Sequence, residues 1–256
     1  MSGAPLKVEL EKDGALLRLR LSRPKANIVD AAMIAALRAA LREHLPGVQL
    51  RAVLLEAEGP HFSFGASVEE HLPGSAAEML RELHALILTL VASTAPVLVA
   101  VRGQCLGGGL ELAAAGHLIF AAPGATLGQP EIKLAVFAPA ASCLLPERIG
   151  PSRAADLLFS GRSIGAEEAH RIGLVDALAD DPSHAALAYF EEHLAPRSPS
   201  SLRIAVHAAR FDYVARVRRK LAKVERLYLK ELMATHDALE GLSAFVEKRP
   251  PVWEER

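Results

Sequence analysis

Short hydrophobic strands alternate with helix-forming stretches over most of the chain, and this order limits the fold more than any other feature. Residues 16–21 alternate leucine with arginine, which is typical of a half-buried strand. The same criteria predict further strands at 52–56, 97–101, 117–121 and 174–179, and helices at 31–45, 75–92 and 110–115. Strands mixed with helices in this way predict an α/β core.

The pattern changes near residue 196. Residues 196–199 contain two prolines and predict a hinge, and beyond them the chain is mainly helical as far as Lys248. We therefore expect a core at 1–195 and a helical region at 196–256. Ten Lys and Arg residues but only two acidic residues lie between Arg197 and Lys230. They form either a solvated helix face or a rim that attracts a polyanionic ligand.

Composition excludes several classes of protein. The 256 residues carry 29 Lys and Arg against 30 Asp and Glu, so the chain lacks the basic balance of a nucleic-acid-binding protein. The most apolar run, 85–101, is interrupted by Ser93, Thr94 and Pro96, and we expect buried core and no membrane span. Cys105 and Cys143 predict buried free thiols, and with no signal peptide in 1–9 they favour a reducing cytoplasm.

One chemically suggestive segment is Gly107-Gly108-Gly109-Leu110-Glu111, between a predicted strand and a predicted helix. Glycines let the backbone turn sharply and approach a ligand closely. A helix that begins there directs free N–H groups and its positive end at whatever lies above it, which suits an oxygen that gains negative charge. Taken alone, the glycines can equally permit close packing, and Glu111 can simply complement the helix dipole.

A second segment is Gly128-Gln129-Pro130-Glu131, at the end of a predicted strand. A carboxylate after a rigid proline, on a loop leaving a sheet, is a common position for a functional group. Alone it is equally well explained as a surface glutamate. The histidines show no spacing that would gather metal ligands, so we expect no metal site.

Together with the loop His61–Ala66, these two segments resemble the crotonase (enoyl-CoA hydratase/isomerase) superfamily. The resemblance extends over essentially the whole chain, and its most specific parts are the glycine run with Glu111 and the Gly-Gln-Pro-Glu motif. Other matching stretches are 23–26, 101–113, 127–131, 169–176 and 245–249.

The resemblance implies a fold, an oligomer and a substrate class. The fold is a crotonase-like spiral of ββα units, and the C-terminal helical region drives trimerisation, with trimers often pairing into hexamers. The substrates are coenzyme A thioesters, so coenzyme A is part of the substrate and no separate cofactor is implied. Homotrimer or hexamer formation would then involve residues 196–256.

The resemblance also assigns roles to four residues. The backbone N–H groups of Ala66 and Gly108 would form the oxyanion hole that holds the thioester oxygen. Glu111 would hold and deprotonate the attacking water, and Glu131 would give a proton to the substrate carbon. Because isomerases and dehalogenases of the superfamily keep one or neither glutamate, retention of both favours hydratase or dehydratase chemistry.

Coenzyme A contacts carry over by the same matching. They are Lys25, Ala26, Ala66 and Val68, with Phe245 and Lys248 expected from the neighbouring subunit. Two positions depart from the pattern, because Ser67 stands where an Asp is usual and Glu69 where a Lys is frequent. The lysine contact to phosphate is therefore in doubt.

The predicted acyl pocket is formed by Phe64, Phe137 and Ala138, and it also departs from common hydratases. Residues 137–143, Phe-Ala-Pro-Ala-Ala-Ser-Cys, replace a glycine-rich segment there. With 62–71 and 131–142, this run resembles the hydratases of cyclohexa-1,5-diene-1-carbonyl-CoA, which serve anaerobic degradation of benzoyl-CoA. Phe64 and Phe137 would then pack near a planar ring.

Other functions remain open at this point. An ordinary enoyl-CoA hydratase with an altered pocket is one, and a double-bond isomerase or decarboxylase of the same fold is another. A non-catalytic protein that senses coenzyme A is disfavoured, because both glutamates and both oxyanion segments are present.

Overall fold

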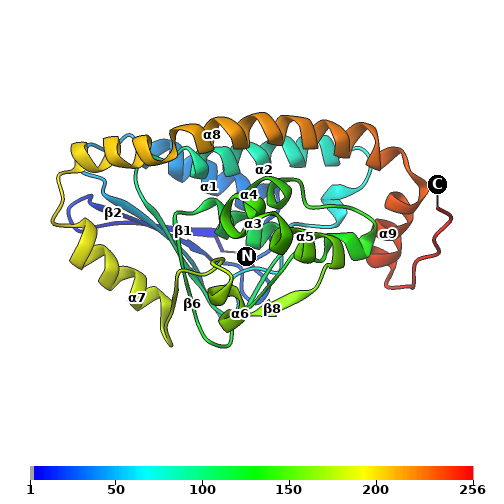
Figure 1. Cartoon of the computed structure of the whole chain (residues 1–256), viewed down its shortest axis with the longest axis horizontal. Helices are drawn as coiled ribbons and strands as arrows, with labels where there is room; N and C mark the ends of the chain where they lie inside the picture. Colours follow the sequence, from blue (N-terminus) through cyan, green and yellow to red (C-terminus); the bar gives the residue numbers. More distant parts are fainter. Residues whose placement is uncertain (1–2, 256) are drawn as a thin grey trace.

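A six-stranded sheet forms the centre of the computed structural model, which describes residues 3–255 (Figure 1). Its strand order is β1-β2-β3-β4-β6-β9; β1 and β2 are antiparallel and every other neighbouring pair is parallel. The strands are β1 (Leu6–Glu11), β2 (Leu16–Leu21), β3 (Ala52–Ala57), β4 (Val97–Val101), β6 (Leu118–Ala121) and β9 (Ala177–Leu178). The prediction of an α/β core is confirmed.

A second, smaller sheet has the order β5-β7-β8. It consists of β5 (Gln104–Leu106), β7 (Thr126–Gly128) and β8 (Ser163–Gly165). These strands have three residues each and lie next to glycines, so they give no clear periodic signal in the sequence. They matter for function because β5 leads into the glycine run and β7 leads into Gln129 and Glu131.

Helices cover both faces of the main sheet. They are α1 (Ala31–His44), α2 (Ala76–Val91), α3 (Gly108–Ala115), α4 (Pro139–Ile149), α5 (Pro151–Ser160), α6 (Ala166–Arg171), α7 (Pro182–Tyr189), α8 (Pro199–Lys230) and α9 (His236–Glu247). Short turns of helix are η1 (Glu69–His71), η2 (Pro130–Leu134), η3 (Phe190–Leu194) and η4 (Leu232–Ala234). Asp30 caps α1 by accepting from the backbone N–H of Met33 at 2.9 Å.

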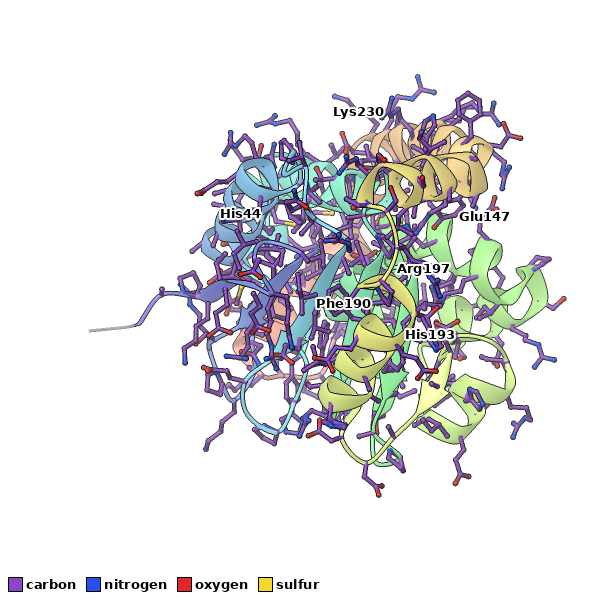
Figure 2. All side chains as sticks on the ribbon, turned by 90° about the vertical axis from the view of Figure 1, so that its left-hand side faces the viewer. His44, Glu147, Phe190, His193, Arg197 and Lys230 are labelled. Atoms are coloured by element: carbon purple, nitrogen blue, oxygen red, sulfur yellow. The ribbon has the colours of Figure 1, made fainter. Side chains whose placement is uncertain are left out.

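Strand β2 shows how the sheet divides the core into two parts. Leu17, Leu19 and Leu21 face the larger hydrophobic cluster, which α1 and α2 complete. Leu16 faces the smaller cluster on the other side, where α7 and η3 pack. Figure 2 shows Phe190 of η3 pointing inward beneath this side of the sheet, where it is fully buried.

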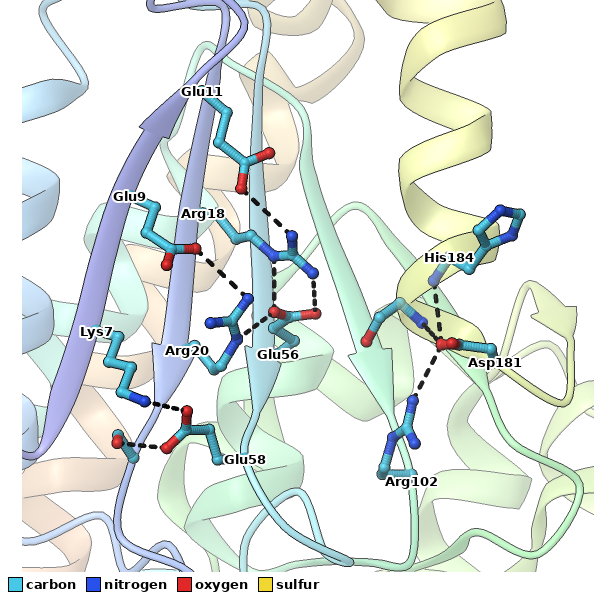
Figure 3. Close-up of polar contacts among 12 residues, drawn as sticks. Lys7, Glu9, Glu11, Arg18, Arg20, Glu56, Glu58, Arg102, Asp181 and His184 are labelled. Atoms are coloured by element: carbon cyan, nitrogen blue, oxygen red, sulfur yellow. Dashed lines mark hydrogen bonds and ion pairs between the residues drawn. The ribbon is translucent and has the colours of Figure 1, made fainter.

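The arginines of β2 lie on the same side as the smaller cluster and are paired with acids. Glu56 of β3 is 3% exposed and accepts from Arg18 and from Arg20, both at 2.7 Å (Figure 3). Glu11 and Glu9 of β1 complete the row by pairing with the same two arginines. The Leu-Arg alternation therefore predicted the strand correctly, and the arginine side is closed by ion pairs between neighbouring strands.

The long helix α8 runs along the molecule above α2 and α4 (Figure 1). Several of its cations bind the core: Arg216 pairs with Glu147 at 2.8 Å, and Lys220 donates to the carbonyl oxygen of Ser142 at 2.6 Å. Part of the basic surplus in this segment therefore fixes α8 to α4. Helix α9, which follows α8 and η4 in the chain, folds back against η2.

Two sequence predictions differ from the structure. The strand expected over 174–179 is reduced to Ala177–Leu178, because only these residues pair with β6. Glu131 does not stand on an open loop; Pro130 begins the short helix η2, and its fixed φ suits the first helical position. Cys105 and Cys143 are buried free thiols, as expected.

Within residues 3–255, no helix is both long enough and apolar enough to cross a membrane.

Candidate active site

A cavity of about 360 Å³ lies where the glycine run, η1, η2, α4 and α9 meet. Its wall is mostly apolar, and two carboxylates enter it. The lining residues are Phe64, Gly65, Ala66, Val68, His71, Leu80, Leu83, Gly107, Gly108, Glu111, Pro130, Glu131, Lys133, Leu134, Val136, Phe137, Ala138, Pro139, Leu242 and Phe245. A cavity of this kind, with few convergent polar groups, is typical of a small-molecule site.

Glu111 enters the cavity from the first turn of α3 and is only 3% exposed. Its Oε1 accepts a hydrogen bond from the backbone N–H of Ala141 at 2.8 Å. Burial raises the pKa of Glu111 to about 7, while the backbone N–H groups of Ala141 and Ala140 act in the opposite direction. Glu111 thus remains a carboxylate at neutral pH in a substantial fraction of molecules.

Glu131 enters the cavity from η2, beside Glu111. Burial and, second, the charge of Glu111 raise the pKa of Glu131 to about 8. The side-chain amide of Gln129, oriented with its nitrogen toward Glu131, donates to both carboxylate oxygens at 2.9 and 3.0 Å. Gln129 is 1% exposed, so this contact holds the carboxyl group in a fixed position.

The two glutamates therefore divide one proton between them near neutral pH. The charge of Glu111 raises the pKa of Glu131, whereas the backbone N–H groups of Ala141 and Ala140 lower the pKa of Glu111, so the proton resides mainly on Glu131. A charged carboxylate beside a protonated one supplies a general base and a general acid in a single cavity.

Gly107 lets Glu131 approach the glycine run. Its φ is +50°, and a Cβ atom built there would lie 2.7 Å from Oε1 of Glu131. Any side chain at this position would therefore strain the backbone and displace the carboxylate. The glycine run was predicted to let the backbone approach a ligand closely; the group that comes close to Gly107 in the structure is the Glu131 carboxylate.

Ala66 and Gly108 lie against each other at the same cavity. A Cβ atom on Gly108 would meet the backbone nitrogen of Ala66 at 3.1 Å, so the two peptide segments are in contact. Gly108 is the first residue of α3, and its N–H therefore has no acceptor within the helix. Both residues line the cavity, so the structure brings together the two amides expected of an oxyanion hole.

A buried polar scaffold supports the loop that carries Ala66. Asn27 is fully buried, with a φ of +45°, and its Nδ2 donates to the carbonyl oxygens of Glu58 and His61 at 3.0 Å each. Ser63 donates to the carbonyl oxygen of Asn27 at 2.8 Å and accepts from the N–H of Gly65 at 3.0 Å. Sequence reasoning missed both residues, although Asn27 directly follows a stretch that carried the resemblance.

The predicted acyl-pocket residues all line the cavity, at different depths. Phe137 lies inside it, edge-on to the ring of Tyr228 at a centroid distance of 5.4 Å. Phe64 stands at the mouth, 44% exposed and edge-on to His61 at 5.0 Å. Ala138 is buried in the wall beside Phe137.

The predicted coenzyme A contacts divide into two groups. Ala66, Val68 and Phe245 line the cavity, whereas Lys25, Ala26 and Lys248 are not part of its wall. Helix α9 folds back in its own chain and places Phe245, 54% exposed, at the cavity of that chain. A contribution of Phe245 to the site of a neighbouring subunit stays a prediction.

Among the residues of or beside the cavity that were not predicted as site residues, His71, Lys133 and Tyr228 carry polar groups. His71 lies in the wall with Nδ1 at 2.7 Å from the carbonyl oxygen of Ser67, and burial lowers its pKa. Lys133 is an exposed cation of the lining. Tyr228 is fully buried against Phe137, and the spacing of the buried residues Val217, Leu221 and Tyr228 on α8 was the available signal.

Ser67 and Glu69, the two positions that depart from the family pattern, contact each other in the structure. Ser67 donates to a carboxylate oxygen of Glu69 at 2.9 Å, so an acid is held beside the cavity at the position where the resemblance would place a lysine. No group of three or more His, Cys, Asp or Glu side chains that could hold a metal ion occurs in the described part of the chain.

Comparison with known proteins places this geometry in a family. The enoyl-CoA hydratase/isomerase family model matches residues 11–256. A cyclohexa-1,5-dienecarbonyl-CoA hydratase of Thauera aromatica is 67% identical over 255 residues, covering 100% of this chain and 99% of that protein. A carnitinyl-CoA dehydratase of Salmonella typhi is 31% identical, with coverages of 97% and 98%.

Solved structures agree with the sequence comparisons. The crystal structure of an enoyl-CoA hydratase/isomerase from Pseudoalteromonas atlantica superposes with a TM-score of 0.84 at 28% identity, covering 97% of this chain and 99% of that one. The crotonase-like fold predicted from the sequence is therefore confirmed. The chain belongs to the enoyl-CoA hydratase/isomerase family, the crotonase superfamily.

Proposed function

We propose that this chain is an acyl-CoA hydratase that adds water to cyclohexa-1,5-diene-1-carbonyl-CoA. The observation that carries the proposal is the pair of glutamates, Glu111 buried and Glu131 half-buried, beside the contacting segments of Ala66 and Gly108. The choice of acyl group draws on the 67% identity to the Thauera aromatica enzyme and on the aromatic residues of the cavity.

The thioester oxygen would accept hydrogen bonds from the N–H groups of Ala66 and Gly108. These donors withdraw electrons from the conjugated ring and stabilise the enolate oxygen that develops when water attacks. Because they belong to the backbone, they are already oriented and need no rearrangement during the reaction. Loss of one such donor costs about 2.7–4 kcal/mol of barrier in enzymes that use the same device.

The two glutamates would move the protons. The carboxylate of Glu111 takes a proton from water as the water oxygen bonds to a carbon of the unsaturated ring. The protonated Glu131 gives its proton to a second ring carbon, so that H and OH are added in total. Transfer of the new proton from Glu111 to Glu131 restores the starting state, and dehydration follows the same steps in reverse.

Binding of the coenzyme A portion is proposed for Lys25, Ala26, Val68, Phe245 and Lys248. The acid at Glu69 disfavours phosphate at the position next to it, and Lys133 at the cavity is a cation that can compensate. The reaction would take place in the cytoplasm, in keeping with two buried free thiols.

A homotrimer, or a hexamer formed by two trimers, is proposed for the assembly, with residues 196–256 as the main contact region. The helix α8 supports this, because it presents Ile204 at 70% and Phe211 at 63% exposure on its outer face. Large apolar side chains exposed on one helix are typical of a surface that another subunit covers.

A substrate panel tests the function. Purified protein would be given crotonyl-CoA, a longer straight-chain enoyl-CoA, cyclohex-1-ene-1-carbonyl-CoA and cyclohexa-1,5-diene-1-carbonyl-CoA, and water addition would be read by mass. We expect preference for the cyclic diene, lost in Glu131→Gln. Preference for crotonyl-CoA would refute the ring substrate and retain the mechanism, whereas double-bond migration without hydration would identify an isomerase.

A further inference from the structure

A second cavity, of about 260 Å³, lies at the far ends of α3 and α4 from the active site. The first turns of these helices serve the active site, through Glu111 of α3 and Ala141 of α4. The second cavity is lined instead by Gly116, which follows α3, and by Glu147 and Arg148 in the last turn of α4. Side chains of α8 complete its wall, and no residue lines both cavities.

Arg210 of α8 is a cation of this wall that the fold does not neutralise. The central carbon of its guanidinium lies 4.6 Å from the centroid of the Tyr213 ring. Burial lowers the pKa of Arg210, and no carboxylate of residues 3–255 acts on it in the opposite direction. The guanidinium nitrogens that have no partner are open to solvent, so a ligand in the cavity can reach them.

The two other charges of the wall already have partners. Arg148 pairs with Asp176 and donates to the carbonyl oxygen of Leu174 at 3.0 Å. A cation in this place is expected, because the last carbonyl groups of a helix attract positive charge. Glu147 pairs with Arg216 at 2.8 Å, so its charge is also compensated.

The ring of His117 adds a donor without an acceptor to the same wall. Its Nδ1 accepts from the backbone N–H of Val97 at 3.0 Å, so the proton of the neutral ring is on Nε2. Burial, then Arg210, then Arg148 lower the pKa of His117 to about 3, and the ring is therefore neutral at neutral pH. Its Nε2–H is enclosed and has no partner in the described part of the chain. This wall therefore offers donors and lacks a free acceptor.

We propose that this cavity binds a small free oxyanion, of the phosphate or carboxylate class, on the guanidinium of Arg210. Guanidinium groups hold such anions through two parallel N–H···O bonds, and Arg148 and Tyr213 adjoin the same space. A volume of about 260 Å³ has room for a phosphate with some of its water, since one water molecule occupies about 30 Å³ in the liquid.

The proposal also gives the basic surplus of α8 a second use. Arg216 and Lys220 fix α8 to α4, whereas Arg210 holds no part of the core by an ion pair and attracts a ligand. The site takes no part in the proposed hydration, so the two proposals are tested separately.

Calorimetric titration of the full chain with inorganic phosphate tests the site, with and without coenzyme A. We expect saturable binding of one phosphate per chain that persists when coenzyme A is present. The thermal unfolding temperature should rise with phosphate and should not rise with chloride at the same ionic strength, because only a bound ligand stabilises the folded state in this way.

Arg210→Gln removes the cation, and Arg219→Gln is the matched control. Arg219 is an exposed residue of the same helix and does not line the cavity. Phosphate affinity should fall about tenfold or more in Arg210→Gln and stay within about twofold of wild type in Arg219→Gln. Arg210→Lys, which keeps the charge and loses the planar fork, should bind phosphate with intermediate affinity. Without phosphate, Arg210→Gln should unfold near the wild-type temperature, since Arg210 has no acid partner to lose.

Three results would overturn the inference. One is the absence of saturable phosphate binding by the wild type. Another is equal phosphate affinity in wild type and Arg210→Gln, which would place the anion elsewhere on the chain. The third is a smaller assembly of Arg210→Gln in sedimentation, with no phosphate bound by the wild type, which would assign Arg210 to a contact between copies of this chain. The substrate panel on the wild type judges the hydratase function independently of all three.

Discussion

Replacing Glu131 by glutamine should stabilise the fold while it abolishes hydration. A carboxyl group whose pKa rises from 4.5 in the unfolded chain to about 8 in the folded protein is protonated preferentially in the folded state. Its destabilising contribution is absent below about pH 4.5, grows between the two pKa values, and is constant above pH 8. Glutamine keeps the shape of the side chain and carries no charge at any pH, so the variant escapes this cost.

The magnitude follows from the pKa difference. Each pKa unit corresponds to about 1.36 kcal/mol, so a rise from 4.5 to about 8 sets a ceiling of about 5 kcal/mol. The Gln129 amide donates to both carboxylate oxygens, and weakening these charge-assisted bonds offsets part of the gain. We expect a net stabilisation of about 2–4 kcal/mol at pH 8.5, or about 5–15 °C in thermal unfolding temperature.

The assay is thermal and urea unfolding of wild type and Glu131→Gln at pH 5.0 and 8.5, at one protein concentration. Glu240→Gln is a control of opposite sign, because Arg249 lowers the pKa of Glu240 to about 2. That contribution is present above the unfolded pKa and is lost as pH falls toward the folded pKa, so the control should lose stability at pH 8.5. A gain in Glu131→Gln that is equal at both pH values, or a loss at pH 8.5, would refute the reasoning.

Three further predictions concern activity and loop stability. The pH profile of kcat/KM should be bell-shaped, falling below about pH 7 as Glu111 gains a proton and above about pH 8 as Glu131 loses one; a flat profile from pH 6 to 9 would contradict the assignment. Gly107→Ala should lower kcat about tenfold or more at wild-type helix content by circular dichroism, since its Cβ would lie 2.7 Å from the Glu131 carboxylate; unchanged kinetics would exclude this contact. Asn27→Ala should lower the free energy of unfolding by about 1–3 kcal/mol in urea titrations, because two loop carbonyls lose a buried donor, and an unchanged midpoint would argue against the scaffold.

Sequence patterns predicted best the elements that consist of a continuous apolar run or that have a clear boundary residue. The strand Val97–Val101 matches its prediction, and α1 begins after the Asp30 cap and ends within a residue of its expected limit. The small sheet was missed because strands of three residues are too short to show alternation. The first strand, Leu6–Glu11, was missed because four of its residues are exposed, as is common for an edge strand.

Sequence motifs predicted the two glutamates of the site, and the packing of distant segments brings the remaining residues beside them. The glycine run and the Gly-Gln-Pro-Glu segment led to Glu111 and Glu131, whose side chains the fold brings into one cavity. Asn27 and Tyr228 could not be found in the same way, because each makes its contacts across more than 30 residues of sequence and neither stands in a motif. The position of Phe245 depends on how α9 folds back, which no local pattern specifies.

The division of labour between the two glutamates follows from the beginning of α4. This helix starts at Pro139 after Ala138, which has no side-chain oxygen, so its first free N–H groups need an acceptor from elsewhere. The Glu111 carboxylate provides it by accepting from Ala141 at 2.8 Å, and it thereby acts as the cap of α4. Two backbone donors and the positive end of a helix stabilise the charged form of Glu111, whereas Glu131 faces that charge and keeps the proton. Under the proposed function, the beginning of α4 would therefore make Glu111 the base and Glu131 the acid, and substitutions at Ala140 or Ala141 should alter this proton balance before they alter substrate binding.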